Sequence, residues 1–349
     1  MNHPEHKKGR GAQINPGNRF NEFNYDTHPL EVAEENPATE YITVHPKTII
    51  TKVKSPDIPF EYSINPYQGC EHGCVYCYAR ESHNYWGYSA GLEFEQKILI
   101  KKDAPRLLEA QLKKKTYLPK PIMLSGNTDP YQPAEQQYGI TRALLQVLWK
   151  YRHPVSIITK NSLILKDLDI ISKLAEHQLI KVCLSITTQD EELRRFMEPR
   201  TSSIKQRFQA LSTLTANQVP TMVMAAPIIP GLNEHEILEI ARRAAEAGAY
   251  SLGYTMVRLN GDIGPIFEDW LRRTYPDRAE KVLNKIKECH NGQLSDTRSR
   301  VRMRGEGKIA DIVKQQFDLA KKLYFKDRCA PPFNMELFEQ YRTPQLTLF

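Results

Sequence analysis

The chain repeats one pattern six times between residues 58 and 275: a short apolar run rich in β-branched residues, then a longer segment with a period of 3.6 residues. The apolar runs are Tyr62–Asn65, Pro121–Ser125, Val155–Lys160, Lys181–Thr187, Thr221–Ile229 and Tyr250–Leu259. They are nearly continuous in apolar character, which is typical of parallel strands buried on both faces. Because parallel strands are joined by right-handed crossover helices, the repetition predicts an α/β chain built on one parallel sheet that curls.

The intervening segments carry helix signals. One helix is expected to begin near Asp103, with Pro105 in its first turn, and another to begin with a capping box at Asn233 and Glu236 and to end at Gly248. The other predicted helices run through Ile140–Tyr151, Leu165–His177, Gln189–Phe196 and Ile204–Asn217. A doubly wound open sheet would fit the same pattern, although the chain has no G-x-G-x-x-G motif to support it.

The composition changes on both sides of the repeat. Residues 1–57 are rich in Pro, Asn, Gly and charge, and predict an N-terminal extension that is largely disordered over Met1–Pro37, with an extended segment at Tyr41–Lys54. Residues 58–275 form the predicted core domain, and residues 276–349 a helical C-terminal extension. Its expected helices are Ala279–Cys289 and Ile309–Phe325.

Charge and hydropathy limit which partners and which cellular location are expected for the protein. The chain has 48 Lys and Arg against 41 Asp and Glu, a net charge of +7 that allows nucleic-acid binding but does not require it. There is no run of eighteen apolar residues and no apolar segment at the N-terminus, so we expect neither a membrane partner nor secretion. The expected location is the cytoplasm, where thiols stay reduced.

Three of the six cysteines lie within eight residues, at Cys70, Cys74 and Cys77, with the spacing C-x3-C-x2-C. Gly69 and Gly73 make this stretch a flexible loop, so that the three thiolates can converge on one metal centre. Three thiolates leave an iron–sulfur cluster one ligand short, with an open iron where a substrate or cofactor can bind.

Zinc, with His72 or His83 as the fourth ligand, and a disulfide-closed loop are the alternatives for this spacing. Structural zinc sites usually combine two C-x2-C pairs, or one C-x2-C pair with an H-x3-5-H pair, and the chain has no second pair of this kind. A disulfide does not suit the reducing compartment expected here. The other cysteines, Cys183, Cys289 and Cys329, are scattered, and we interpret them as ordinary core or surface thiols.

The cysteine loop resembles the signature of the radical S-adenosylmethionine (SAM) enzymes, C-x3-C-x-aromatic-C, with Tyr76 in the aromatic position. The longer string Ser63–Cys70, with Tyr78-Ala79-Arg80 after the loop, resembles the branch related to spore photoproduct lyase, often labelled DNA repair photolyase-like. The resemblance implies a partial (β/α)6 barrel, a [4Fe-4S] cluster held by the three cysteines, and SAM as the ligand of the open iron.

The same resemblance implies an activity. The reduced cluster cleaves SAM to a 5′-deoxyadenosyl radical, which takes hydrogen from a substrate in the barrel mouth. An electron donor such as a flavodoxin or ferredoxin would supply the electron. The substrate is unassigned.

The candidate cofactor contacts follow the ends of the predicted strands, where βα loops converge on one mouth. The resemblance assigns the SAM amino group to Asn127 and Thr128, the carboxylate to Lys160, the ribose to Ser185, and the adenine to Tyr76, Ala226 and Ile229. Two departures from the family pattern accompany these assignments. Gly126–Asp129 stands in place of a Gly-Gly-Glu-like turn, and Pro227 replaces the first Gly of a G-x-I-x-G-x-x-E element.

Two features bear on a DNA substrate. Tyr76 and Tyr78 flank Cys77 as tyrosines do in the photoproduct lyases, where they are linked to radical relay, so both are catalytic candidates. Four arginines recur at every second position of the tail, and in an extended segment they would share one face that could meet phosphates: Arg298, Arg300, Arg302 and Arg304.

One feature argues against that substrate. Those lyases carry a hydrogen-donating cysteine at the end of the second strand, and Ser125–Asp129 contains none. We therefore favour a radical SAM enzyme of unassigned substrate. DNA-lesion repair and a non-catalytic iron–sulfur protein that binds nucleic acid are the alternatives. Arg200, in Glu198-Pro199-Arg200, is equally suited to an anion or to an internal ion pair.

Overall fold

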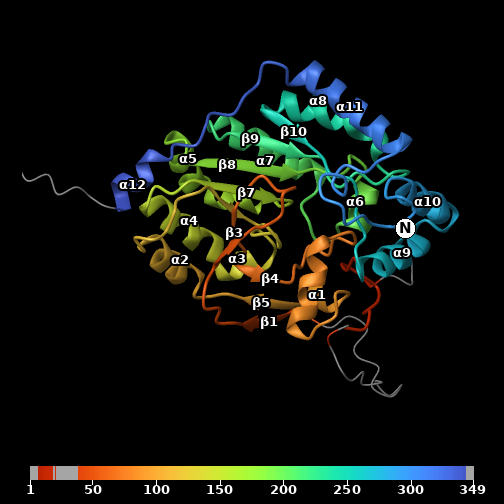
Figure 1. The fold of residues 1–349 in the computed structure, drawn as a ribbon, viewed down its shortest axis with the longest axis horizontal. Helices are drawn as coiled ribbons and strands as arrows, with labels where there is room; N and C mark the ends of the chain where they lie inside the picture. The colour runs from red at the N-terminus through yellow and green to blue at the C-terminus, as the bar shows by residue number, and fades with distance from the viewer. Residues whose placement is uncertain (1–6, 19, 21–37, 343–349) are drawn as a thin grey trace, which may run out of the picture.

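A seven-stranded sheet, with strand order β10-β9-β8-β7-β6-β3-β2, forms the centre of the computed structural model, which describes residues 7–18, 20 and 38–342 (Figure 1). Six of its strands are parallel, and β2 is antiparallel to β3 at one edge. The strands are β2 (Ile50–Lys52), β3 (Tyr62–Ile64), β6 (Ile122–Leu124), β7 (Val155–Thr159), β8 (Ile180–Ser185), β9 (Thr221–Met224) and β10 (Ser251–Gly253). The predicted parallel α/β sheet is confirmed.

The last two parallel strands are shorter than the apolar runs that predicted them. The run Thr221–Ile229 forms β9 only as far as Met224, and pairing resumes as a single parallel bridge between Ile228 and Met256. Pro227 lies in the gap and has no N–H to donate to a ladder, which interrupts the strand.

Helices cover the outer face of this sheet (Figure 1). The α-helices are α1 (Glu93–Gln96), α2 (Ala104–Leu112), α3 (Ala134–Tyr138), α4 (Ile140–Lys150), α5 (Leu168–Glu176), α6 (Glu191–Met197), α7 (Ile204–Ala216), α8 (Ile237–Glu246), α9 (Ile263–Thr274), α10 (Ala279–Glu288), α11 (Lys308–Tyr324) and α12 (Glu336–Arg342). Short 3-10 helices are η1 (Tyr78–Trp86), η2 (Ser162–Asp167), η3 (Glu234–Glu236) and η4 (Pro276–Arg278). None of the helices in the described part of the chain is long and apolar enough to cross a membrane.

The two faces of the sheet differ in burial. Ile157, Leu184 and Val223 point outward into the main core and are at most 1% exposed. Because side chains alternate along a strand, their neighbours point to the inner face, where Ile158 and Met222 are only half-buried. Cys183 and Ser185, on the same inner face, are buried. The expectation that the strands are buried on both faces therefore holds for the outer face and for only part of the inner face.

A second, three-stranded sheet carries the cysteine loop. Its order is β1 (Glu40–Thr43), β5 (Lys97–Ile100) and β4 (Tyr67–Gln68), with β1 parallel and β4 antiparallel to β5. The extended segment predicted at Tyr41–Lys54 is thus two strands that belong to different sheets. The loop begins directly after β4, so this small sheet determines where it starts.

Residues 7–18 pack against the body of the protein, although the sequence predicted disorder there. Ala12 is fully buried, and the backbone N–H groups of Gly11 and Ala12 donate to the Glu95 carboxylate at 3.0 and 2.8 Å. Residues 1–6, 19 and 21–37, the rest of the predicted disordered stretch apart from Phe20, lie outside the described residues. The domain boundaries at 57/58 and 275/276 stay predictions.

The arginine-rich segment is not the extended stripe that the sequence predicted, because residues 298–304 form turns. Arg298 pairs with Asp296 at 2.5 Å, Arg302 with Asp57 at 2.6 Å, and Arg304 donates to the Tyr254 carbonyl at 3.0 Å. Nearby acceptors therefore fold these side chains back onto the protein.

These contacts turn residues 298–304 into a seam between the two edges of the open sheet. On the β2 side, Asp57 lies in the β2–β3 connection and holds the Arg302 side chain and the Arg300 N–H. On the β10 side, the Met256 N–H donates to the Met303 carbonyl at 3.0 Å. The seam closes the barrel where no strand pairing does.

We predict that Asp57→Asn loosens this seam and lowers the melting temperature at neutral pH. Hydrogen bonds from the Arg300 N–H and the Arg302 guanidinium lower the pKa of Asp57 below its ordinary value of 3.8. A carboxyl with a depressed folded-state pKa stabilises the fold above its unfolded pKa, and this contribution disappears as the pH falls through the folded value. The difference between wild type and variant should therefore shrink below about pH 4.

Thermal unfolding of both proteins from pH 3 to 8 tests this prediction. Asp327→Asn, a change of the same charge at an exposed position, should leave the melting temperature close to that of the wild type. Equal melting temperatures for Asp57→Asn and wild type at pH 7 would contradict the role of the seam.

Candidate functional site

The cysteine loop is buried beside the mouth of the curled sheet. Cys70 and Cys74 are each 7% exposed, and Cys77 is partly exposed. Gly69 and Gly73 have positive φ angles of 78° and 67°, and a Cβ at Gly69 would stand 2.7 Å from a backbone oxygen of β5. Both loop glycines are therefore required by the turn.

The donor set of the loop fits an iron–sulfur cluster. Burial raises the pKa of the Cys70, Cys74 and Cys77 thiols, so a bound cationic centre is what would keep them as thiolates. Thiolates are the ligands of such clusters. Within the described residues, no three His, Cys, Asp or Glu side chains already stand in a metal-binding arrangement. The fit therefore rests on the donor type and the shared buried loop.

A buried ion pair supports the loop from below. Arg80 and Glu95 are both fully buried and pair at 2.5 Å. Arg80 also donates through Nε to the Cys74 carbonyl at 3.0 Å, so it connects the loop to α1. The backbone N–H groups of Gly11 and Ala12 complete the contacts of Glu95, which makes the N-terminal segment part of the support.

The other side of the loop is held by Gln132. Its amide donates to the Gly69 carbonyl at 3.2 Å and accepts from the Glu71 N–H at 3.0 Å. The Glu71 carboxylate pairs with Arg200 at 3.1 Å. Of the two readings left open for Arg200, the structure shows the internal ion pair.

His72 connects the loop to the ends of two strands. Its Nδ1 lies 3.3 Å from an Asp129 oxygen, and its Nε2 lies 3.2 Å from the Asn161 side-chain nitrogen. Asp129 also accepts from the Thr159 hydroxyl at 2.7 Å and from the Lys160 N–H at 2.8 Å. Because both ring nitrogens of His72 have partners, this residue does not supply a fourth zinc ligand.

His83, the other candidate fourth ligand, is fully buried against the rings of Tyr88 and Phe94. Neither of its ring nitrogens has a hydrogen-bond partner within the described residues. Burial lowers the pKa of His83 to about 4, so it is neutral near pH 7. Its ring contacts give it a packing role.

Tyr76 belongs to a buried polar network. Its hydroxyl donates to the Glu198 carboxylate and lies 3.3 Å from the Thr187 hydroxyl. Glu198 pairs with Arg207 at 2.5 Å, and Arg207 donates to the Ser185 carbonyl at 3.0 Å. The network therefore fixes the tyrosine of the cysteine loop to the end of β8.

The network also sets the charges around Tyr76. Burial, together with the Glu198 carboxylate, raises the pKa of Tyr76 well above its ordinary value. Burial opposes ionisation of Glu198, but Arg207 and Lys160 lower the pKa of that carboxyl to about 2. Glu198 is therefore an anion and Tyr76 a neutral phenol near pH 7.

Tyr78, the second tyrosine of the loop, has a different setting. It opens η1, is 52% exposed, and donates from its hydroxyl to the Gly126 carbonyl at 2.8 Å. It therefore reaches from the cysteine loop to the end of β6, across the rim of the barrel. Its catalytic role, like that of Tyr76, stays a prediction.

The fold already uses several polar atoms of Asn127 and Thr128. Both backbone N–H groups donate to the Asn65 side chain, at 2.7 and 3.3 Å. The Thr128 hydroxyl donates to the Tyr67 carbonyl at 2.7 Å, and the Asn127 amide to the Ser82 hydroxyl at 3.0 Å. The structure thus places both residues beside the start of the cysteine loop.

Lys160 is different, because its ammonium group has no hydrogen bond or ion pair among residues 7–18, 20 and 38–342. The group lies 5.8 Å from the centre of the Tyr76 ring. Its positive charge acts on Cys74, Cys77 and Glu198. A half-buried lysine beside the loop therefore has all three of its donor positions unused.

The predicted ribose and adenine contacts lie along the ends of β8 and β9. Ser185 ends β8, and the Ala226 carbonyl accepts from the Thr187 hydroxyl at 3.0 Å. Ile229 is fully buried in one apolar cluster with Cys74 and Tyr76, and its N–H donates to the Asn233 side chain at 2.7 Å. Ile229 can therefore offer an apolar side chain but not its amide.

The capping box predicted at Asn233 and Glu236 is wrong. The Asn233 amide donates to the Thr187 and Pro227 carbonyls at 2.7 and 3.0 Å. The Glu236 carboxylate accepts from the Thr188 hydroxyl and from the Gln189 N–H. Tertiary contacts between the ends of β8 and β9 therefore replace the local cap.

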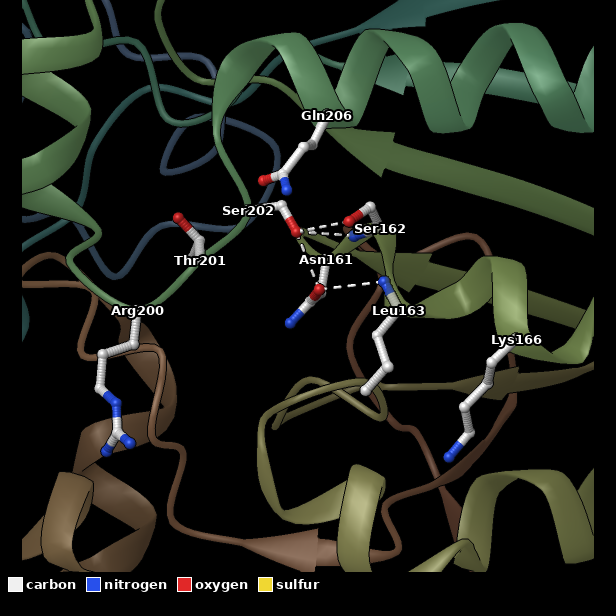
Figure 2. A pocket seen from close by; sticks show the side chains of 8 residues that line it. All are labelled: Asn161, Ser162, Leu163, Lys166, Arg200, Thr201, Ser202 and Gln206. Atoms are coloured by element: carbon white, nitrogen blue, oxygen red, sulfur yellow. Dashed lines mark hydrogen bonds between the residues drawn. The ribbon is translucent and has the colours of Figure 1, made fainter.

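An open pocket of 510 Å³ lies on the outer side of the loop, beyond Glu71 and His72. Its lining residues are Asn161, Ser162, Leu163, Lys166, Arg200, Thr201, Ser202 and Gln206. Figure 2 shows Arg200 and Lys166 on opposite sides of a hydrogen-bonded group of Asn161, Ser162 and Ser202. None of the predicted cofactor contacts is among the residues that line this pocket, although Asn161 directly follows Lys160.

Sequence comparison gives three related results. The family model of the radical SAM superfamily matches residues 64–244, more than half of the chain. An uncharacterized protein of Mycobacterium tuberculosis, Rv2578c, is 30% identical over 251 residues, which cover 70% of this chain and 74% of the relative. An uncharacterized protein of Methanocaldococcus jannaschii, MJ0683, is 30% identical over 250 residues, which cover 72% of this chain and 89% of the relative.

Structure comparison shows a shared fold with spore photoproduct lyase. A mutant of that enzyme superposes with a TM-score of 0.60 at 15% identity, covering 82% of this chain and 79% of the lyase. One solved form of the lyase holds AdoMet and a dinucleoside spore photoproduct. At this identity the likeness concerns the fold, and it confirms the predicted barrel architecture.

We predict that Glu95→Gln destabilises the protein by about 3–5 kcal/mol, the usual cost of leaving one member of a buried ion pair without its partner. Urea unfolding of the metal-free protein measures the loss. Glu246→Gln, which removes a carboxylate that is 61% exposed in a surface pair, should cost no more than about 1 kcal/mol. Similar losses for the two variants would contradict the supporting role of Glu95.

Proposed function

The chain belongs to the radical SAM superfamily, whose members use a [4Fe-4S] cluster and SAM, and we propose that it is an enzyme of this kind with a substrate held in the barrel mouth. When bound, the cluster and SAM supply a 5′-deoxyadenosyl radical that takes a hydrogen atom from the substrate. The observation that carries the proposal is the buried loop of Cys70, Cys74 and Cys77, with the ammonium of Lys160 beside it and without an ion pair in the part of the chain that the structure describes.

The three loop cysteines are the proposed cluster ligands. Gly69 and Gly73 allow the tight turn, and Arg80 fixes the carbonyl of Cys74 from below. Burial of the loop keeps water from the thiolates, which protects a reducible centre from side reactions.

Lys160 is the proposed partner of the SAM carboxylate. Its backbone is fixed by Asp129, and its ammonium lies over the ring of Tyr76 with no partner in the described part of the chain. An anion placed there would gain a charge-assisted hydrogen bond without breaking an existing one. The cation also compensates the negative charge that three thiolates bring to the loop.

The remaining proposed contacts surround the same space. Tyr76, Ala226 and Ile229 offer apolar surface for the adenine, and Ser185 offers a hydroxyl for the ribose. Asn127 and Thr128 are proposed near the amino group, where oxygen atoms of their side chains can still accept hydrogen bonds. In this arrangement the Tyr76 ring positions the purine, and Glu198 accepts a hydrogen bond from the Tyr76 hydroxyl.

Enzymes of this superfamily need a reductant, and we propose a flavodoxin or a ferredoxin for this chain. Electrons must enter near the cysteine loop. Glu71 and His72 of that loop contact Arg200 and Asn161, two of the residues that line the pocket in Figure 2. The proposed cytoplasmic location suits both the donor and a reducible cluster.

Repair of a DNA lesion is a second candidate, favoured by the fold shared with spore photoproduct lyase and by Tyr78 at the barrel rim. Two observations weigh against it. Ser125–Asp129 contains no cysteine, and Arg298 and Arg302, two of the four tail arginines that could meet phosphates, are held in ion pairs within the protein. A third candidate, a non-catalytic iron–sulfur protein that binds nucleic acid, would keep its cluster but make no 5′-deoxyadenosine.

We predict that replacing Cys70, Cys74 and Cys77 together by Ala abolishes both the brown absorbance of the reconstituted protein and its SAM cleavage. The measurement is anaerobic, with dithionite as reductant and 5′-deoxyadenosine as product. Cys329→Ala, at an exposed thiol far along the sequence, should retain both signals. SAM cleavage by the triple variant would contradict the proposed function.

Lys160→Gln should weaken SAM binding about tenfold or more, the size expected for one charge-assisted hydrogen bond. Calorimetric titration of the reconstituted protein with SAM measures the dissociation constant, and Lys160→Arg should restore part of the affinity. Lys205→Gln, an exposed lysine of α7, is the matched control. An unchanged dissociation constant in Lys160→Gln would remove Lys160 from the SAM site.

A further inference from the structure

We propose that the barrel mouth binds a substrate that carries an oxyanion, a phosphate or a carboxylate, and that Arg258 is the residue that recognises it. This inference rests on the proposed function, because it names the substrate class of the same site. It is carried by a half-buried guanidinium in the segment after β10, close enough to Tyr78 to interact with it electrostatically, and without a carboxylate of its own among the described residues.

Arg258 stands in the segment that follows β10. The neighbouring residues are well fixed: the Val257 carbonyl contacts the His290 ring at 2.7 Å, and the Leu259 N–H donates to a carbonyl at 3.1 Å. A few residues on, the Asp262 N–H donates to Glu81 of η1 at 2.7 Å. The segment of Arg258 is therefore docked on the helix that begins with Tyr78.

Together with the groups around it, the Arg258 guanidinium forms a cluster with more positive than negative charge. Arg258 interacts electrostatically with Arg302, Tyr78 and Asp57. Asp57 is the only carboxylate of these groups, and it already holds the Arg302 side chain and the Arg300 N–H. Two guanidinium groups therefore share one carboxylate, which leaves one positive charge without compensation.

Within residues 7–18, 20 and 38–342, Arg258 makes no hydrogen bond and no ion pair. A half-buried cation without a partner is costly, and proteins usually pair such groups or use them to bind an anion. Guanidinium presents planar pairs of donors that match phosphate and carboxylate oxygens. All of the donors of Arg258 are available for such a ligand.

Apolar side chains line the inner face of β9, which pairs with β10, the strand that precedes Arg258. Met222 and Met224 are half-buried on the inner face of β9, and both side chains lie over Gly253 of β10, where a Cβ would come within 3.2 Å of Met224. Methionine side chains adapt to ligands of different shape. The barrel therefore joins an oxyanion site at Arg258 to apolar surface, and suits an organic anion with an apolar body.

Lys160 does not fill the same role. Its charge acts on the cysteine loop and on Glu198, whereas Arg258 acts on Tyr78 and the seam. The two unpaired cations therefore serve different parts of the mouth: Lys160 the cofactor side and Arg258 the substrate side.

The test measures oxyanion binding by calorimetry, with the full chain, its cluster reconstituted and SAM present at saturation. Two probe pairs distinguish phosphate from carboxylate: thymidylyl-thymidine with its uncharged methylphosphonate analogue, and N-acetylphenylalanine with its amide. The wild type should bind one charged probe at least tenfold more tightly than its uncharged analogue. Arg258→Gln should lose that preference, and Arg258→Lys should keep part of it.

Arg195→Gln is the matched control, because this arginine of α6 is 72% exposed. It should bind the probe as the wild type does. Since Arg258 has no partner in the described chain, Arg258→Gln should melt no lower than the wild type, which separates lost binding from lost folding.

Three results would overturn the inference: no binding of either charged probe by the wild type, equal binding by Arg258→Gln, or tighter binding of the probe when the titration is repeated without SAM, which would show that the two compete for one site. A wild type that cleaves SAM but binds no oxyanion refutes this inference alone. One that binds the oxyanion through Arg258 but makes no 5′-deoxyadenosine refutes the proposed function instead.

Discussion

The buried ion pair between Arg80 and Glu95 is the interaction on which the position of the cysteine loop depends. One arginine joins the Cys74 carbonyl to α1, and one carboxylate collects two N–H groups of the N-terminal segment. A buried pair of this kind adds little net stability against a hydrophobic alternative, but removing either member leaves an uncompensated charge. The pair therefore serves to fix one geometry of the loop.

Buried charges also connect the loop to the barrel. His72 reaches the ends of β6 and β7 through Asp129, and Tyr76 reaches the end of β8 through Glu198 and Arg207. Each link spans a large distance in sequence, so the contacts that hold the loop depend on the assembled sheet. The site is thus supported by polar contacts on several sides, while Lys160 and Arg258 are left without partners in the described residues.

The seam formed by residues 298–304 shows why charge spacing is a weak guide to function. Arginines at every second position share a face only if the chain is extended, and here it turns. Asp57 and Asp296 capture two of them, and the segment becomes the closure of an open barrel. The cation proposed to bind the substrate is instead Arg258, which lies in no motif.

The sequence by itself determined the parallel sheet, most of its helices and the three cysteines, because periodicity and ligand spacing are local properties of the chain. The predicted strand at Val155–Lys160 and the predicted helix at Ile204–Asn217 differ from the observed elements by single residues. The helix cap predicted at Asn233 from the local sequence is wrong, because the Asn233 amide instead donates to Thr187, just after β8. Only the tertiary structure decided that Glu95, Asp129 and Glu198 hold the loop, and that Arg258 has no partner among the residues the structure describes. Pairing of charges depends on which distant residues meet in the fold.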